Sequence, residues 1–415
     1  MPKTRAARST ARASAREAER LLIELPADVL GHILYYLPLA HNIALTGLTC
    51  HALCAAAKLA FKARPFSGEV VTLAGHAGAI NGVAAAPDGR VITGSSDHIV
   101  MVWRDGVCEA TFSQHQQNVM AVSVLPGGAR VVSIDDNGVA MVWALSADSK
   151  YTLERTFDVD SAVYNHATVI LSGVPYVVGH HVVEDDDEHE ERKITLHDLD
   201  GTLTHTFAGP REGWVNAVVA TLDGQKLITS ASEESNVNIW MVATKTLVSA
   251  CEHPCAVEAL SVMPNDQRFL SGSDDGDVRV WAIDGSLQDT FKLQYGGVNA
   301  LVALPDNQHA LSGGGYHDDD AAVKLFNVND GNVMRTFTHH SRQVYCLALL
   351  PDGLRFVSGS VDRTACIVEH GLAATPAPSY VAAFKEVLKA RVKAAEEGLR
   401  RAREELAAFE AKNIN

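Results

Sequence analysis

Imidazole, hydroxyl and carboxylate side chains recur together along this chain, and nucleophilic hydrolases use the same three groups. His76, Thr93 and Asp97 form the clearest set. In a hydrolase the imidazole takes the proton of the hydroxyl, and the carboxylate orients the imidazole. Whether these residues act in that way depends on the elements that position them.

Three further groups contain side chains that bind transition metals. They are His180, His181 and His189 beside an acidic run, His317 before Asp318, Asp319 and Asp320, and Cys251, His253 and Cys255. A metal needs ligands that the fold holds in place, and the first two groups lie in sequence typical of loops. The third surrounds a strand-to-strand turn, where alternation directs its side chains apart. We therefore expect no metal site and no cofactor.

Composition excludes several classes of function. The 415 residues carry a formal net charge of −15, and because residues 1–20 carry +4 and residues 381–415 carry +2, the middle carries −21. An acidic surface repels the nucleic-acid backbone, so no nucleic-acid partner is expected. No apolar run reaches the roughly 18 residues of a membrane span. The seven cysteines are scattered without a CxxC pair, which favours a reducing compartment, the cytoplasm or the nucleus.

A repeat with a period near forty residues organises the middle of the chain. Strand ends similar to "VW" are spaced by 40, 54, 43, 41, 45 and 42 residues, at Trp103, Trp143, His197, Trp240, Trp281, Phe326 and Val368. Hairpin turns such as Pro87-Asp88-Gly89 precede them. The pattern predicts an all-β fold, a seven-bladed β-propeller over residues 69–370 with four antiparallel strands per blade. The segment Glu69 to Leu73 is expected to complete the last blade.

The segments Gly75 to Trp103 and Ser271 to Trp281 resemble the WD-repeat family. The resemblance implies a hydrogen-bonded tetrad of His76, Thr93 or Ser95, Asp97 and Trp103 inside the first blade. A buried carboxylate is costly unless donors surround it, so this set is structural and no catalytic residue is expected. In the same pattern Asn137 and Glu234 replace the Asp of blades two and four, and Val368 replaces the last Trp. Those blades are expected to be less rigid.

The third repeat is longer than the others by about a dozen residues. The excess coincides with the acidic run Glu184 to Arg192, which predicts a solvated hairpin loop. A docking segment for a basic partner is the alternative.

Residues 21–62 change to a helical pattern, with Pro26 at a helix start and a Pro38 stop. The stretch resembles the F-box. That resemblance implies a substrate receptor of a cullin-based ubiquitin ligase, in which these helices bind a Skp-type adaptor and the propeller binds the protein substrate. The alternative is a non-ligase WD-repeat scaffold whose helices cap the propeller. The expected adaptor-binding residues are Leu25, Pro26, Val29, Leu30, Ile33, Leu34 and Leu37.

The two ends of the chain carry further patterns. Residues 1–20 form a basic tail with Arg5, Arg8, Arg12 and Arg16 on one helical side, which fits a disordered tail, a transit peptide or a nuclear-import patch. Residues 378–412 have apolar residues at coiled-coil spacing. They predict a long helix, which either forms a homodimer or lies on a neighbouring surface.

The WD-repeat resemblance also implies which residues face a partner at one end of the propeller axis, here the upper face. None of them is Lys or Arg, the residues that pair with phosphate. We therefore expect a protein partner with a basic or polar-aromatic segment, recognised without phosphorylation, with Tyr164, Tyr345 and Trp214 as apolar contacts. The expected face comprises Asn81, Met120, Asp136, Tyr164, Asn216, Glu233, Glu258, Asp274, Asn299, Asp319 and Tyr345.

Overall fold

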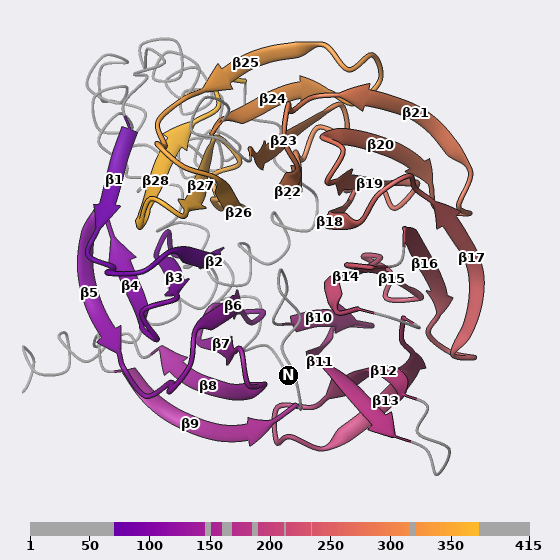
Figure 1. The fold of residues 1–415 in the computed structure, drawn as a ribbon. Coiled ribbons are helices and arrows are strands. Elements are labelled where there is room, and N and C mark those ends of the chain that lie inside the picture. Colours follow the sequence, from indigo (N-terminus) through magenta and orange to yellow (C-terminus); the bar gives the residue numbers. More distant parts are fainter. Residues whose placement is uncertain are drawn as a thin grey trace, which may run out of the picture.

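Seven four-stranded antiparallel sheets surround a central axis (Figure 1). The computed structural model describes residues 70–145, 151–159, 168–184, 190–210, 213–233, 235–315 and 321–372. All described elements are strands. The seven-bladed propeller predicted from the sequence is confirmed. The basic tail 1–20, the F-box-like residues 21–62 and the helix predicted over 378–412 lie outside the described residues.

Blades 1 to 4 follow one another along the chain, each with its first strand nearest the axis. Their strands are β2 (Ile80–Ala85), β3 (Val91–Ser95), β4 (Val100–Arg104) and β5 (Val107–Phe112); β6 (Val119–Val124), β7 (Arg130–Asp135), β8 (Val139–Leu145) and β9 (Tyr151–Asp158); β10 (Thr168–Leu171), β11 (Val174–Glu184), β12 (Glu190–His197) and β13 (Leu203–Ala208); and β14 (Val215–Ala220), β15 (Lys226–Ala231), β16 (Asn236–Met241) and β17 (Thr246–Glu252).

Blades 5 to 7 continue the order, and the last blade takes its outer strand from the beginning of the propeller. Their strands are β18 (Val257–Val262), β19 (Arg268–Ser273), β20 (Asp277–Ala282) and β21 (Leu287–Lys292); β22 (Val298–Ala303), β23 (His309–Gly314), β24 (Val323–Asn327) and β25 (Val333–Phe337); and β26 (Val344–Leu349), β27 (Arg355–Ser360), β28 (Thr364–Glu369) and β1 (Val70–Ala74).

Closure of the ring depends on β1. It pairs antiparallel with β28, from Val70 opposite Val368 to Ala74 opposite Thr364. The closing strand therefore lies one residue further along the chain than the segment Glu69 to Leu73 expected from the sequence. Leu73 is fully buried. The pairing removes an edge of blade 7 that would otherwise expose unpaired backbone groups.

Each seam between neighbouring blades contains one cluster of buried apolar side chains. At the seam between blades 7 and 1, Ile80 meets Val357 and both are fully buried. Each blade is thereby covered on both faces. This explains why second strands such as β3, β19 and β27 are buried at nearly every residue rather than at alternate ones, whereas outer strands such as β21 are largely exposed.

Blades approach one another closely at a repeated position of the second strand. A Cβ on Gly94 would lie 2.6 Å from Val119 Cγ1 of the next blade, and one on Gly359 would lie 2.6 Å from Ile80 Cγ2. Gly94 lies three residues after Val91, the ladder partner of Trp103. In blade 3, His180 lies three residues after Val177, the ladder partner of His197, and therefore occupies the same position. Blade 3 therefore inserts a polar ring where four blades have glycine.

The hairpin of blade 3 is longer than the sequence suggested. The ladder between β11 and β12 continues to the pair Glu184 and Glu190, so part of the acidic insertion extends the strands. The loop residues 185–189 lie outside the described residues, as does His189.

Candidate functional site

A cavity of about 470 Å³ opens on the propeller axis. We call it the axial cavity. Its size falls within the range of about 300–1,000 Å³ typical of ligand pockets. The lining residues are Asn81, Met120, Trp214, Asn216, Ser232, Glu258, Asp274, Asn299, Gln343 and Tyr345.

Six of these side chains occupy the second position of the first strand of their blades: Asn81 in β2, Met120 in β6, Asn216 in β14, Glu258 in β18, Asn299 in β22 and Tyr345 in β26. At each of them the strand register shifts, so the residue has no partner in the ladder. A β-bulge of this kind re-aims a side chain. The preceding residue is buried in the seam, as Val257 is before Glu258. Bulging thus turns one residue toward the axis in each of these six blades.

Residues expected at the upper face divide into three groups in the structure. Seven line the axial cavity, while Asp136 and Glu233 are exposed and do not line it. Tyr164 and Asp319 lie outside the described residues. Trp214, expected as an apolar contact, also lines the cavity and is 49% exposed.

A recurring backbone hydrogen bond corrects the assignment in blade 4. Ser96, Asp136, Asp274 and Val361 each donate their N–H to the residue two positions before the bulge of their own blade. In blade 4 the donor of this bond is Ser232, which bonds the carbonyl of Trp214 at 2.9 Å. Glu233 was expected at the upper face as the residue just before the acid of its tetrad, but this hydrogen bond assigns that position to Ser232. The wrong assignment came from taking Glu234 as the tetrad residue.

Amide side chains connect the bulges of neighbouring blades. Asn81 Nδ2 donates to the carbonyl of Val119 at 3.0 Å, and Asn216 Nδ2 donates to that of Val257 at 3.2 Å. Both carbonyls belong to the next blade, beside its bulge. These asparagines therefore stabilise the rim in addition to lining it.

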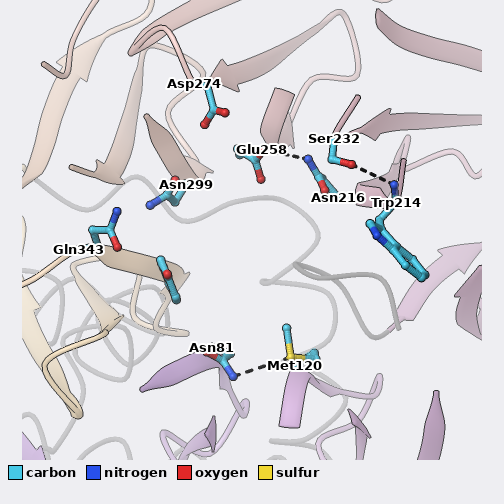
Figure 2. Close-up of a pocket in the computed structure, with 10 residues that line it drawn as sticks. Asn81, Met120, Trp214, Asn216, Ser232, Glu258, Asp274, Asn299 and Gln343 are labelled. Atoms are coloured by element: carbon cyan, nitrogen blue, oxygen red, sulfur yellow. Dashed lines mark hydrogen bonds between the residues drawn. The ribbon is translucent and has the colours of Figure 1, made fainter. Parts of the chain in front are cut away.

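Two acids give the axial cavity its charge. Burial raises the pKa of Glu258 to about 7, and the carboxylate of Asp274 adds to the rise. Asn216 Nδ2 opposes it by donating to Glu258 Oε1 at 2.9 Å. Lysine, arginine and histidine are absent from the lining residues that the structure describes. Figure 2 shows Asn299 and Asn216 on either side of Glu258, with Asp274 beside it.

The four residues of the implied tetrad form one hydrogen-bonded chain in blade 1. His76 Nδ1 lies 2.9 Å from Asp97 Oδ2, His76 Nε2 lies 2.7 Å from Thr93 Oγ1, and Trp103 Nε1 donates to the same Oγ1 at 2.9 Å. Burial lowers the pKa of His76. The hydroxyl is fully buried. Its hydrogen bonds connect two strands and a loop inside the blade, away from the axial cavity.

Blade 2 contains an equivalent chain, contrary to the expectation that Asn137 leaves it incomplete. The carboxylate comes from Asp135, the last residue of β7. His115 Nδ1 lies 3.0 Å from Asp135 Oδ2, and Ser133 Oγ bonds both His115 at 2.7 Å and Trp143 at 2.9 Å. Asn137 is exposed.

Blade 7 replaces its missing tryptophan by a second histidine. His340 Nε2 and His339 Nε2 each lie 2.8 Å from Ser358 Oγ, so His339 makes the contact that indoles make in blades 1 and 2. Together with Cys366 these histidines place three potential metal-ligand atoms within 4.8 Å of one another. Both Nε2 atoms are directed at the hydroxyl, which accounts for the cluster as part of the core.

Blade 5 uses its candidate metal residues in the same structural way. His253 Nε2 lies 2.7 Å from Ser271 Oγ, and its Nδ1 lies 3.1 Å from the carbonyl of Cys251. In blades 1 and 2 the histidine pairs with the acid of the tetrad. In blade 5 the acid Asp275 instead forms an ion pair with Arg279, at 2.9 Å.

The tetrad of blade 2 gives a matched pair of substitutions. Asp135→Ala is expected to lower the free energy of unfolding by about 2–3 kcal/mol, because it leaves a buried imidazole and the Val139 N–H without their acceptor. Asn137→Ala should change it by less than about 0.5 kcal/mol. Urea unfolding of the full chain measures both. Equal losses would show that Asp135 is not the tetrad acid.

Five segments match the protein-family model for the WD domain, G-beta repeat: residues 67–104, 106–144, 201–241, 245–282 and 331–369. Each match covers the outer strand of one blade and the three inner strands of the next, so that the inner strands of blades 1, 2, 4, 5 and 7 are matched. The structure shows that the unmatched stretches between them contain the inner strands of blades 3 and 6. The chain is therefore a seven-bladed WD-repeat propeller, a protein-interaction fold.

Curated relatives span several functions. The beta subunit of a guanine nucleotide-binding protein from Solanum tuberosum is 25% identical over 72% of this chain and 82% of its own length. Apoptotic protease-activating factor 1 of Rattus norvegicus is 23% identical over 70% of this chain, which spans only 22% of that protein. Autophagy-related protein 16 of Arabidopsis thaliana is 22% identical over 67% of this chain and 53% of its own length. At these identities the shared feature is the repeat.

The described part of the chain contains no helix that is long and apolar enough to cross a membrane.

Proposed function

We propose that the propeller is the receptor part of this protein and captures a protein segment with basic or polar-aromatic side chains at its upper face. The axial cavity carries this proposal, because it places Glu258 and Asp274 beside neutral amides and the aromatic rings of Trp214 and Tyr345. Carboxylates attract a basic segment and repel a phosphorylated one.

We further propose that the protein is the substrate-recognition subunit of a cullin-based ubiquitin ligase in the cytoplasm or nucleus. The F-box resemblance of residues 21–62 supports this, with Leu25 and Pro26 at its start. The ligase would act by proximity, since holding a substrate near a charged carrier raises its effective concentration. A scaffold of another assembly is the second candidate, because the curated relatives include beta subunits of guanine nucleotide-binding proteins.

The double substitution Leu25→Ala with Pro26→Ala separates the two candidates. In the full chain it should abolish capture of a Skp-type adaptor in a pull-down and leave the melting temperature of the propeller unchanged. Leu203→Ala with Pro126→Ala is the matched control, since it changes the same residue types at exposed positions of the propeller. Adaptor capture by the double mutant, or no capture by the unaltered chain, would favour the scaffold.

We also propose that the helix predicted over residues 378–412 joins two copies of the chain in a homodimer. Light scattering of the full chain and of a chain of residues 1–378 tests this proposal. A mass of twice the monomer that falls on truncation would support a homodimer, and an unchanged monomeric mass would remove it.

A further inference from the structure

The charge of the axial cavity is concentrated on one wall. Glu258 follows the first residue of β18 and Asp274 follows β19, so blade 5 contributes both acids. Asn216 of blade 4 and Asn299 of blade 6 flank them (Figure 2). Asn81 and Met120 lie across the cavity from this acidic wall (Figure 2). A ligand that fits would thus carry its charge on one side only.

Mutual proximity of the two acids is unfavourable when both are ionised. Asp274 and burial both hold the pKa of Glu258 near 7, which means that the cavity disfavours a second negative charge. A cation between the carboxylates would reverse this effect, because an opposite charge within about 4–6 Å favours the ionised form. A cation placed between Glu258 and Asp274 would therefore be attracted by both carboxylates.

We propose that the axial cavity binds a single arginine side chain of the protein partner, with the guanidinium against Glu258 and Asp274. This deepens the proposed function, on which it rests. The cavity is large enough for one side chain with its ordered water. Trp214 and Tyr345 offer ring surfaces on which a guanidinium or its aliphatic stem can pack.

Arginine fits this wall better than lysine for two reasons. Guanidinium directs five N–H donors in one plane, which matches a wall that combines two carboxylates with the side-chain carbonyls of Asn216 and Asn299. It is also less strongly hydrated than an ammonium group, so that its transfer into a half-enclosed cavity costs less.

Tryptophan fluorescence can report occupancy of the cavity. The chain has five tryptophans, and Trp103, Trp143, Trp240 and Trp281 are buried in the blades. Trp214 is half-exposed and lines the cavity. A ligand in the cavity should change its emission and its accessibility to acrylamide, and Trp214→Phe should remove the change.

The test titrates the full chain with capped nine-residue Gly-Ser peptides that carry one central arginine, lysine or citrulline. Citrulline has the shape of arginine without its charge. We expect the arginine peptide to bind at least tenfold more tightly than the citrulline peptide, with lysine between them. Glu258→Gln, which keeps the acceptor for Asn216, should reduce the ratio of arginine to citrulline affinity to near one. Asp136→Asn is the matched control, an exposed acid of the upper face outside the cavity, and should keep the ratio.

Equal binding of arginine and citrulline peptides, or an unchanged ratio in Glu258→Gln, would overturn the inference and leave the broader proposal in place. Equal binding of free arginine and the arginine peptide would overturn the assignment to a protein partner. The proposed function itself fails by a different result, preferential capture of phosphopeptides over every lysine- and arginine-rich peptide in an array. Thermal melting of each variant establishes that the fold is retained.

Discussion

Acidification from pH 7 to pH 5 is expected to lower the free energy of unfolding by about 4 kcal/mol through four groups, three histidines and one glutamate, whose pKa values are strongly shifted. Burial is the main cause that lowers the pKa of His180, His253 and His339 to about 4. Because each folded pKa lies below the unfolded value near 6.5, the folded state binds fewer protons. This stability is present above pH 6.5 and is lost as the pH falls from 6.5 to 4. Each histidine contributes about 2 kcal/mol to the loss between pH 7 and 5.

Glu258 acts in the opposite direction. Its folded pKa is raised from 4.5 to about 7, so the carboxyl costs stability that builds up as the pH rises from 4.5 to 7, and acidification relieves this cost. Between pH 7 and 5 the relief is about 2 kcal/mol, which reduces the three histidine contributions to the net value above. Chemical unfolding at half-unit pH intervals measures the curve.

Two substitutions should move this curve in opposite senses. His180 makes no hydrogen bond through its ring nitrogens and packs edge-on against Trp214, with ring centroids 5.7 Å apart. His180→Phe keeps a ring there and should shrink the loss by about 2 kcal/mol. Glu258→Gln removes the opposing group and should enlarge it by a similar amount. Unchanged slopes in both variants would show that other groups govern the acid response.

Removal of residues 1–74 is expected to destabilise the propeller strongly, whereas removal of residues 1–69 should preserve its stability. The two chains differ by β1 alone. Without β1, blade 7 loses the buried side chain of Leu73 and the ladder from Val70 to Ala74. Burial of a leucine contributes about 2–3 kcal/mol and each backbone hydrogen bond about 1 kcal/mol. The exposed edge of β28 also favours aggregation.

Size-exclusion chromatography and thermal melting compare the two truncations. The longer chain should elute as a folded protein with a cooperative transition, and the shorter one should aggregate or melt more than about 10 °C lower. Equal melting temperatures would mean that β28 does not need its outer partner. Adaptor capture should be lost in both, so that binding and folding are read separately.

Much of the architecture could be predicted from the turn residues and the repeated strand ends in the sequence. The turns and the "VW"-like ends recur because each blade must reverse direction three times, so the number of blades could be counted even in repeats three and six, which the family model does not match. Positions relative to the tryptophans were less certain. Counting back from Trp143 selected Asn137, whereas the carboxylate comes from Asp135, two positions earlier. The distance in sequence from the tryptophan identifies the tetrad acid only when the turn between them has the same length in every blade.

The axial cavity was accessible to sequence reasoning for a related reason. Its residues follow the first apolar position of each inner strand, and that position is easily seen in a repeat. Gln343 and Ser232 were missed, because no apolar landmark marks the loops from which they reach the cavity. His180 could not be foreseen as a buried group. Only the register of blade 3 shows that it replaces a seam glycine.

The pairing of the first and last strands also bears on how the chain is made. Thr72 and Cys366 contact each other although they lie 294 residues apart. At about 5–20 residues per second, a ribosome needs roughly 15 to 60 seconds to supply the partner of β1 after β1 has been synthesised. During this interval blade 1 can fold, but β1 remains a single exposed strand that is prone to wrong pairing. Closure of the ring therefore has to await the synthesis of β28, and cellular factors that shield a nascent strand would act on β1, the first described strand.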